Sequence, residues 1–196
     1  MSHFNKVANE WDSEGKTKMM QKLASETLKK LALSSKVDMM DFGCGTGLFG
    51  LEFIEYAKSL KGIDVSAGML EGFDRKTDQQ TEISSLKLDL EANELEDTFD
   101  LIVSSMAFHH LNTPLQVLLK LKKALRAGGK IAIVDLNEED GSFHPDNEGM
   151  GVKHFGFSQA ELSLWANKAG LSIEHSFINN IAKNGKEYKQ FLAIYS

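Results

Sequence analysis

The stretch VDMMDFGCGTG, residues 37–47, decides how the rest of the chain is interpreted. Its first half, Val37–Phe42, is a short apolar run of the kind that forms a buried β-strand. Its second half places Gly43, Gly45 and Gly47 at alternate positions directly after that run. Glycines let a backbone turn tightly and approach a ligand with no side chain in the way. The stretch therefore predicts a buried strand that turns into a ligand-binding loop.

Outward from this stretch, short β-rich runs alternate with helical patterns as far as Asp135. Such alternation is typical of βαβ units and predicts an α/β fold: a doubly wound, mostly parallel sheet with helices on both faces. We expect strands at Val37–Phe42, Leu60–Asp64, Ile83–Leu88, Phe99–Ser104 and Lys130–Asp135. We expect helices at Thr46–Lys58, Ala67–Arg75 and Pro114–Leu125.

The segment before the sheet, residues 1–35, carries Met20, Leu23, Thr27 and Leu31 at helical spacing. This pattern predicts an amphipathic helix that packs onto the domain. The segment is expected to serve as a helical lid or packing element.

The pattern changes after the last predicted parallel strand. Residues 137–157 are polar and rich in glycine, and so long a loop usually has a function, so we expect an active-site lid there. Residues 158–196 begin with a capping box, Ser158 and Glu161, which predicts a helix. Two β-like runs joined by a turn then predict a closing hairpin. The runs are Leu171–Ile178 and Tyr188–Tyr195, and the turn is Asn184-Gly185.

Composition limits the class of protein. The chain has 196 residues, of which 42% are hydrophobic and 26% are charged, as expected for one globular domain. A net charge of −6 argues against nucleic acid as the main partner, because tight phosphate binding needs clustered Lys and Arg. We find no apolar run long enough to span a membrane and no leader peptide. The single cysteine, Cys44, cannot form an internal disulfide, and a cytoplasmic location is expected.

Three acids accompany the predicted strand ends. Asp41 precedes the glycine loop, Asp64 ends the next strand, and Asp89 follows the third. The carboxyl ends of parallel strands share one edge of the sheet, where open α/β sheets bind ligands. A carboxylate at the position of Asp64 can accept two hydrogen bonds from a ribose diol.

These residues resemble the class I S-adenosylmethionine-dependent methyltransferases. Asp41-x-Gly43-x-Gly45-x-Gly47 is similar to the first motif of that family, and residues 62–66 with Met69-Leu70 are similar to the second. Residues 99–104 resemble the fourth strand, which borders the transferred methyl group, and residues 125–130 resemble the turn into the fifth. Four motifs in the right order are more specific than one glycine loop. They cover residues 37–135 and continue into a matching helix and hairpin.

The resemblance implies a seven-stranded sheet whose last strand is antiparallel, with residues 36–136 as the cofactor-binding core. It implies S-adenosyl-L-methionine as cofactor and S-adenosyl-L-homocysteine as product. Asp41 and the glycine loop would hold the amino-acid part, Asp64 the ribose, and Asp89 with the Leu90 backbone the adenine. The cofactor-binding residues expected are Asp41, Gly43, Cys44, Gly45, Gly47, Asp64, Val65, Met69, Asp89, Leu90 and Ser104.

Two alternatives stay open. Gly45-x-Gly47-x-x-Gly50 with Asp64 also fits the dinucleotide fingerprint of nicotinamide oxidoreductases. Against that reading, Asp41 precedes the loop, no second domain is available for a hydride acceptor, and each tyrosine lacks a lysine four residues on. A catalytically silent, cofactor-binding regulatory protein is the other alternative, and a turnover assay would identify it.

The segment after the fourth strand, residues 104–110, narrows the substrate. It lacks the paired prolines of nucleic-acid and protein amide N-methyltransferases, and the nucleophilic cysteine of cytosine C5 enzymes. Asp135, Glu138 and Asp140 match no metal site that the spacing supports, so no metal is expected. We therefore expect methyl transfer to an O, N, S or C atom of a small soluble molecule.

Histidines supply the candidate catalytic groups. His109 and His110 follow the fourth strand, and imidazole titrates near neutrality, so either could take a proton from the acceptor. Because they are adjacent, at most one is expected to point into the pocket, and His109 is favoured. Cys44 is expected to be a packing residue rather than a nucleophile. Candidate walls of the substrate pocket are Phe4, Trp11, His144, His154 and Phe155.

Overall fold

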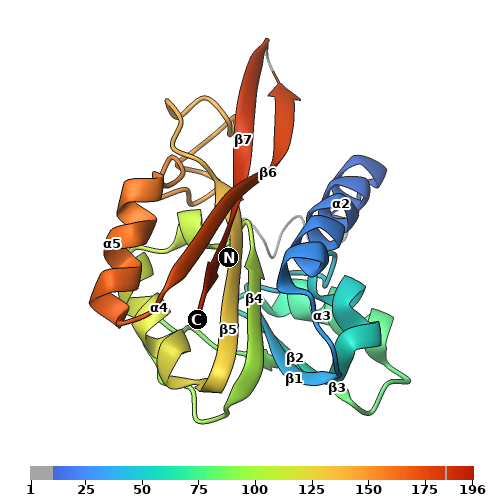
Figure 1. Cartoon of the computed structure of the whole chain (residues 1–196). Coiled ribbons are helices and arrows are strands. Elements are labelled where there is room, and N and C mark those ends of the chain that lie inside the picture. Colours follow the sequence, from blue (N-terminus) through green and yellow to red (C-terminus); the bar gives the residue numbers. More distant parts are fainter. Residues whose placement is uncertain (1–10, 184) are drawn as a thin grey trace.

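The computed structural model describes residues 11–183 and 185–196, which form a seven-stranded sheet with helices on both faces (Figure 1). The strands are β1 (Val37–Phe42), β2 (Ala57–Asp64), β3 (Ile83–Lys87), β4 (Phe99–Ser105), β5 (Leu125–Leu136), β6 (Ile173–Lys183) and β7 (Lys186–Tyr195). The α-helices are α2 (Glu14–Leu31), α3 (Ala67–Thr77), α4 (Pro114–Lys123) and α5 (Gln159–Ala169). Two 3-10 helices are η2 (Gly50–Tyr56) and η3 (Phe108–His110).

The strands lie in the order β3-β2-β1-β4-β5-β7-β6. The first five pair in parallel, whereas β7 runs antiparallel to both β5 and β6. The predicted α/β fold, with its mostly parallel sheet and C-terminal antiparallel hairpin, is confirmed. The strand order reverses between β1 and β4, and such a switch point leaves a crevice at the carboxyl ends of the strands. Within the described ranges, no helix is both long and apolar enough to cross a membrane.

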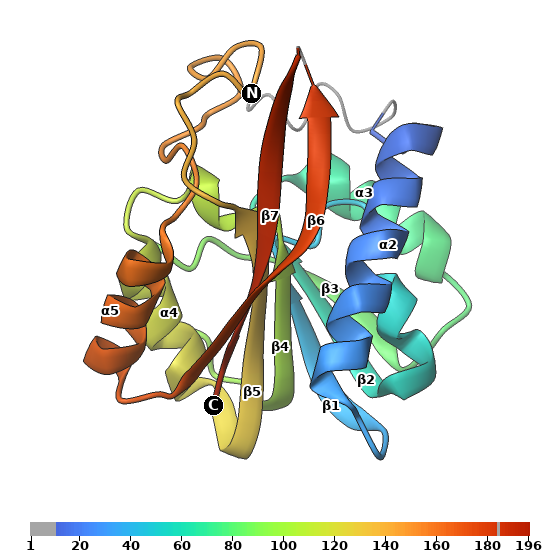
Figure 2. The same ribbon diagram turned by 45° about the horizontal axis from the view of Figure 1, so that its top comes forward.

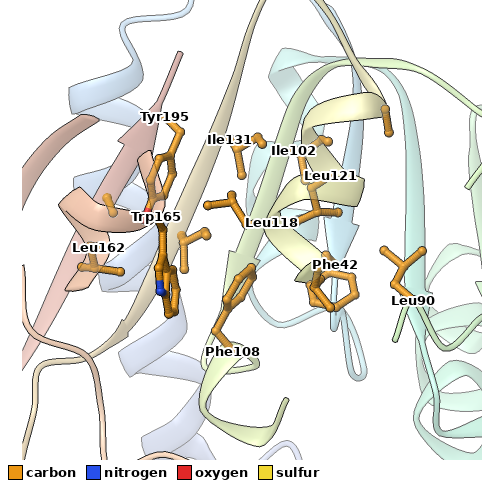
Figure 3. Packing of buried hydrophobic residues seen from close by; sticks show 14 of the residues in the cluster. Phe42, Leu90, Ile102, Phe108, Leu118, Leu121, Ile131, Leu162, Trp165 and Tyr195 are labelled. Atoms are coloured by element: carbon orange, nitrogen blue, oxygen red, sulfur yellow. The ribbon is translucent and has the colours of Figure 1, made fainter. Parts of the chain in front are cut away.

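One face of the sheet is covered by α4 and α5. Figure 3 shows the core between them and the sheet, where Phe108 lies between Trp165 of α5 and Phe42 of β1. The ring centroids are 6.4 Å apart for Phe108 and Trp165, and 5.8 Å apart for Phe42 and Phe108. Since Phe108 is fully buried, it anchors η3 and thereby fixes the two histidines that follow it.

The other face is covered by α2, η2 and α3. Leu23 of α2, Phe53 of η2 and Phe73 of α3 share one buried cluster with the inward side chains of the strands. The predicted N-terminal amphipathic helix is confirmed as α2, in which Leu23, Thr27 and Leu31 are buried. Figure 2 shows α2 lying across this face of the sheet, to the right of the hairpin.

The helix predicted at Thr46–Lys58 is wrong. The structure has a turn at residues 45–49, the 3-10 helix η2, and then β2, which already begins at Ala57. Gly47 has φ +85°, which an α-helix does not accommodate, and the Gly50 amide donates to Asp41 Oδ2 at 3.1 Å. That bond holds the start of the segment against the end of β1, so an ordinary α-helical first turn does not form.

Other boundaries differ by a few residues. The helix predicted at Pro114–Leu125 ends at Lys123, because Leu125 already pairs with Phe99 in the sheet. The predicted hairpin is confirmed, but its paired part is longer and reaches Lys183 and Lys186. Gly185 has the positive φ expected at the turn, and Asn184 lies outside the described residues.

The loop of residues 137–157 lies beside the end of the hairpin (Figures 1 and 2). Its two ends are joined by a β-bridge between Asn137 and Phe157, and the Phe157 amide donates to the Leu136 carbonyl at 2.9 Å. Phe143 of the loop packs edge-on against Tyr188 of β7, with ring centroids 5.1 Å apart. The hairpin therefore braces the loop over the carboxyl edge of the sheet.

Candidate active site

A cavity of about 310 Å³ opens at the carboxyl ends of β1, β2 and β4. This volume lies at the lower end of the range for small-molecule sites. Its wall is formed by Trp11, Met20, Asp41, Phe42, Gly43, Cys44, Gly45, Thr46, Leu48, Phe49, Ile63, Asp64, Val65, Met69, Leu88, Asp89, Glu91, Ser105, Met106, Ala107, His110 and Leu111.

The glycine loop forms the floor of this cavity. The amides of Gly43 and Cys44 both donate to the Ile63 carbonyl, at 2.8 and 3.1 Å, which turns the chain sharply after β1. Gly43 has φ +69°, and a Cβ there would lie 2.4 Å from the Cβ of Ala107. Gly45 has φ +54°, but a Cβ there would meet nothing within 4 Å. The loop therefore needs glycine for its shape, and at Gly45 it leaves open space.

Asp64 closes the loop from the neighbouring strand. One carboxylate oxygen accepts the Gly45 amide at 2.9 Å, and the other accepts the Ser66 amide at 2.8 Å. Burial raises the pKa of the Asp64 carboxyl, against the opposing effect of these backbone donors. A carboxylate has about four acceptor sites, and Asp64 lies on the cavity wall, so these backbone bonds leave acceptor capacity for a ligand.

Asp41 is more deeply buried than Asp64, with 1% of its surface exposed. Burial raises its pKa to about 7, the Gly50 amide works in the opposite direction, and the charge of Asp64 adds to the rise. Asp41 therefore changes charge near neutral pH, and a cationic group bound beside it favours the ionised form.

The residues present fit S-adenosylmethionine. Gly45 leaves room for a ligand against the backbone, and Asp64 retains acceptors of the kind that a ribose diol needs. Asp41 would offer a buried carboxylate to the cationic amino group of the ligand, and Asp89 is also on the cavity wall. Apolar surface from Met69 and neighbouring residues completes the wall.

Three of the residues expected to bind the cofactor do not line the cavity. Gly47 is buried, and a Cβ there would lie 2.7 Å from Leu51. Ser104 is fully buried and donates from Oγ to the Phe42 carbonyl at 2.8 Å, which ties β4 to β1. The Leu90 side chain belongs to the core beneath α4. All three shape the site from behind its wall.

Trp11 lies on the cavity wall, with the ammonium of Lys16 3.4 Å from its ring centroid. The next residue, Asp12, accepts from Thr46 Oγ1 at 2.5 Å and from Lys76 Nζ at 2.6 Å. These bonds clamp the start of the described chain onto the glycine loop. Phe4, also expected in the pocket, lies outside the described residues.

His109 is 1% exposed and turns away from the cavity toward the end of β5. Its Nδ1 lies 2.6 Å from Asp135 Oδ1, and its backbone amide donates to Asp135 Oδ2 at 3.2 Å. Burial works to raise the pKa of Asp135, but the His109 ring and the Leu136 amide outweigh it and hold the pKa below its ordinary value. The Asp135 carboxylate is thus ionised and can only accept hydrogen bonds. His109 Nδ1 is therefore the protonated ring nitrogen and donates to Asp135.

His110, rather than His109, is on the cavity wall. Its Nδ1 donates to the Gly151 carbonyl at 3.2 Å, which joins it to the loop of residues 137–157. Burial and the neighbouring His109 lower the pKa of His110 to about 3. His144, on that loop, has its ring centroid 5.0 Å from that of His109, and burial lowers its pKa to about 4.

The remaining pocket candidates lie away from the wall. His154 packs its ring against Phe157, at 5.2 Å between centroids, and its amide donates to the His109 carbonyl at 3.0 Å. Phe155 is 47% exposed and lies over Gly141 on the outer side of the loop. Neither side chain is therefore on the cavity wall.

Cys44 lies on the wall but is nearly buried, and burial together with Asp41 and Asp64 raises the pKa of its thiol. A protonated, buried thiol is a packing group. Among the described residues, no group of three or more His, Cys, Asp or Glu side chains is placed to hold a metal ion.

Two residues of the site were missed in the sequence. Asp135 is the last residue but one of β5, and the argument used for Asp64, an acid at a strand end on the same edge, was the available signal. Met106 follows β4 with φ +54° and takes a hydrogen bond on its sulfur from the buried Gln190, at 3.1 Å. A non-glycine residue in the left-handed region is strained, and such residues are enriched at active sites and ligand-binding sites. No pattern in the sequence predicts this backbone conformation at Met106.

Comparisons with known proteins agree with this geometry. The family described as a methyltransferase domain matches residues 40–133. An uncharacterized methyltransferase of Schizosaccharomyces pombe is 33% identical over 150 residues, covering 68% of this chain and 53% of the relative. The tRNA U34 carboxymethyltransferase of Shewanella woodyi is 28% identical over 176 residues, covering 85% and 51%. The chain thus spans about half the length of these curated relatives.

Among solved structures, DhpI in complex with S-adenosylhomocysteine superimposes with a TM-score of 0.76. The two sequences are 17% identical, and the match covers 97% of this chain and 92% of the other. At 17% identity this likeness shows a shared fold alone. The sequence matches indicate similarity to methyltransferases. The matched part of the chain, residues 40–133, is therefore a methyltransferase domain, and the chain shares the class I fold of the S-adenosylhomocysteine-bound structure.

Proposed function

We propose that this chain transfers the methyl group of S-adenosylmethionine to a nucleophilic atom of a small molecule. The observation that carries the proposal is Asp64, which retains acceptor sites next to the open backbone of Gly45 in a cavity of about 310 Å³. The cofactor supplies a methyl group on a positively charged sulfur, which leaves as a neutral thioether. Alignment and exclusion of water are then the main tasks of the protein.

The acceptor is expected near η3, where Met106, Ala107 and His110 form the wall next to β4. His110 faces the cavity, and His109 stands behind it, bonded to Asp135. In our proposal these histidines hold the acceptor by hydrogen bonds or receive its proton. Loop 137–157 covers them as a lid that keeps water out.

A small acceptor is supported by the charge around the site. Loop 137–157 has one cationic residue, Lys153, and five carboxylates, Glu138, Glu139, Asp140, Asp146 and Glu148. Asp89 and Glu91 add negative charge to the cavity wall. A polyanion such as tRNA would be repelled here, since nucleic-acid sites need clustered cations. A tRNA substrate, as named for one relative, is therefore not favoured by the negative charge of this surface.

The nicotinamide alternative loses support from the local structure. Dinucleotides bind with their pyrophosphate at the N-terminus of the helix that follows the glycine loop. Here a seven-residue 3-10 helix follows the loop, and Asp41 takes the Gly50 amide.

Calorimetry tests the cofactor. S-adenosylmethionine and S-adenosylhomocysteine should bind, and NADH should not. Asp64→Ala removes two charge-assisted bonds to the ribose, so the affinity should fall by about 10²- to 10⁴-fold. Asp74→Ala, which removes an exposed carboxylate of α3 away from the cavity, is the matched control. Circular dichroism checks that both variants fold. NADH binding without S-adenosylmethionine binding would contradict the proposal.

The acceptor class is tested separately. Protein and cofactor labelled in the methyl group are incubated with a small-molecule extract or with purified tRNA from the same cells. Label should pass to the small molecules. Transfer to tRNA alone would contradict the small-molecule part, and no transfer to any fraction would favour a silent, cofactor-binding regulator.

A further inference from the structure

Buried polar atoms without hydrogen-bond partners gather beneath loop 137–157. Among the described residues these atoms are His109 Nε2, Glu139 Oε1, His144 Nδ1, Asn147 Oδ1 and His154 Nε2, with His175 Nε2 and Tyr195 Oη elsewhere, on β6 and β7. Folded proteins pair nearly all such atoms, because an unpaired one loses its hydration without compensation. A concentration of them in one loop and its floor indicates a binding site for a polar ligand.

The chemistry of these atoms specifies what the ligand offers. His109 donates from Nδ1 to Asp135, so in the neutral ring Nε2 is an acceptor. Asn147 donates from Nδ2 to the Gly141 carbonyl, and its free atom is the carbonyl oxygen, also an acceptor. The free atom of Glu139 is a carboxylate oxygen. A ligand that satisfies this set must bring N–H or O–H donors.

The charge of the region favours the same ligand. Asp135 is ionised and fully buried beneath His109, whose ring it faces. Beside the loop, Lys183 donates to the Phe143 carbonyl, and Lys186 pairs with Asp140 at 2.6 Å. The loop itself carries one cation, Lys153, against five carboxylates. The negative charge of this region would repel a carboxylate or phosphate ligand. It would attract an ammonium group and would not repel a hydroxyl group.

The imidazole cluster of His109, His110 and His144 links this region to the cofactor cavity. The ring centroids of His109 and His110 are 4.1 Å apart, and those of His109 and His144 are 5.0 Å apart. Because His110 is on the cavity wall, a ligand at the cluster lies next to the end of the cavity formed by Met106 and Ala107.

We propose that the imidazole cluster is the acceptor subsite and that the methyl acceptor is a small amine or alcohol whose N–H or O–H group donates to His109 Nε2. Asp135 is the positioning residue that fixes the His109 tautomer. During transfer, the bond from the acceptor atom to carbon forms, the carbon–sulfur bond breaks, and the proton of the acceptor passes to imidazole. This inference rests on the proposed function, whose cofactor it assumes.

The test uses protein labelled with ¹⁵N-histidine and saturated with S-adenosylhomocysteine. Ethanolamine is the probe for the amine and alcohol class, and glycolate is the matched anionic probe. Ethanolamine should shift the ¹⁵N resonance of His109 Nε2 and bind at least about tenfold more tightly than glycolate, in the millimolar range expected of a fragment. Equal or tighter binding of glycolate, or an unmoved His109 Nε2 resonance, would overturn the proposal.

Variants locate the site. His144→Phe, on the partly exposed loop, should weaken ethanolamine binding about tenfold or more, as expected for a lost hydrogen bond of this kind. His175→Phe removes the unpaired nitrogen on β6 and should leave binding unchanged. Equal losses in both variants would refute the assignment. S-adenosylhomocysteine binding is titrated first, so a failure of the proposed function is seen independently of this result.

The role of Asp135 has its own readout. Asp135→Asn should move the His109 proton toward a mixture of Nδ1 and Nε2 tautomers, visible in the ¹⁵N spectrum. Loss of packing alone would leave the tautomer unchanged, so an unaltered nitrogen pattern in the folded variant would refute the positioning role.

Discussion

Replacement of the buried acid at the end of β1, Asp41→Asn, should stabilise the protein while weakening its cofactor binding. Burial raises the Asp41 pKa from 3.8 to about 7. A carboxyl with a raised pKa contributes stability below its unfolded pKa, and this contribution is lost as pH rises toward the folded value. At about 1.4 kcal/mol per pKa unit, a rise of about three units corresponds to about 4 kcal/mol lost between pH 4 and pH 7.

The amide of Asp41→Asn avoids this loss, and its oxygen still accepts the Gly50 amide. Urea unfolding, followed by circular dichroism at pH 5, 6, 7 and 8, measures the difference. The advantage of the variant should grow up to about pH 7 and then level off, whereas its affinity for S-adenosylmethionine should fall. Asp38→Asn is the control of opposite sign, because Arg126 and Ser59 lower the Asp38 pKa. A variant less stable than the parent at pH 8, or an advantage independent of pH, would refute the reasoning.

Three further predictions follow from the site. Gly43→Ala places a Cβ against Ala107 at a positive φ, and should cost about 1–3 kcal/mol in unfolding free energy by urea titration; an unchanged midpoint would contradict the close approach. Amides of residues 137–157 should exchange hydrogen faster without ligands than with cofactor and acceptor bound, and equal protection would remove the lid role. The lowered Asp135 pKa contributes stability that is lost as pH falls below about 4, so Asp135→Asn should be less stable at pH 7, with a gap that narrows in acid. A gap independent of pH would contradict that assignment.

The parts of the site that were predictable are local in sequence. The strand β1, the glycine loop and Asp64 each follow from a short pattern, because strand ends and tight turns depend on a few neighbouring residues. The prediction of a helix over residues 46–58 was wrong because it also relied on a local pattern. Its pattern looked helical, but Gly47 and the bond from Gly50 to Asp41 override it.

The histidine arrangement depended on contacts that are distant in sequence. His109 and Asp135 are 26 residues apart and meet because β4 and β5 lie side by side. Sequence alone gave no means of deciding which histidine faces the cavity, and the favoured one, His109, turns inward to Asp135 whereas His110 lines the wall. The position of Phe155 was equally undecidable, since its ring lies against Gly141, fourteen residues earlier in the chain.

The closely spaced ends of loop 137–157 have a consequence for the evolution and redesign of this fold. Because Asn137 and Phe157 are bridged, the segment between them enters and leaves the fold at one point. It can be exchanged for a cassette of another length without shifting β5 or α5, since loop length alone changes the cost of closure slowly. The residues around the cofactor, from Asp41 to Ala107, lie outside that cassette. Under the proposed function, acceptor preference is therefore free to diverge while the methyl donor stays the same.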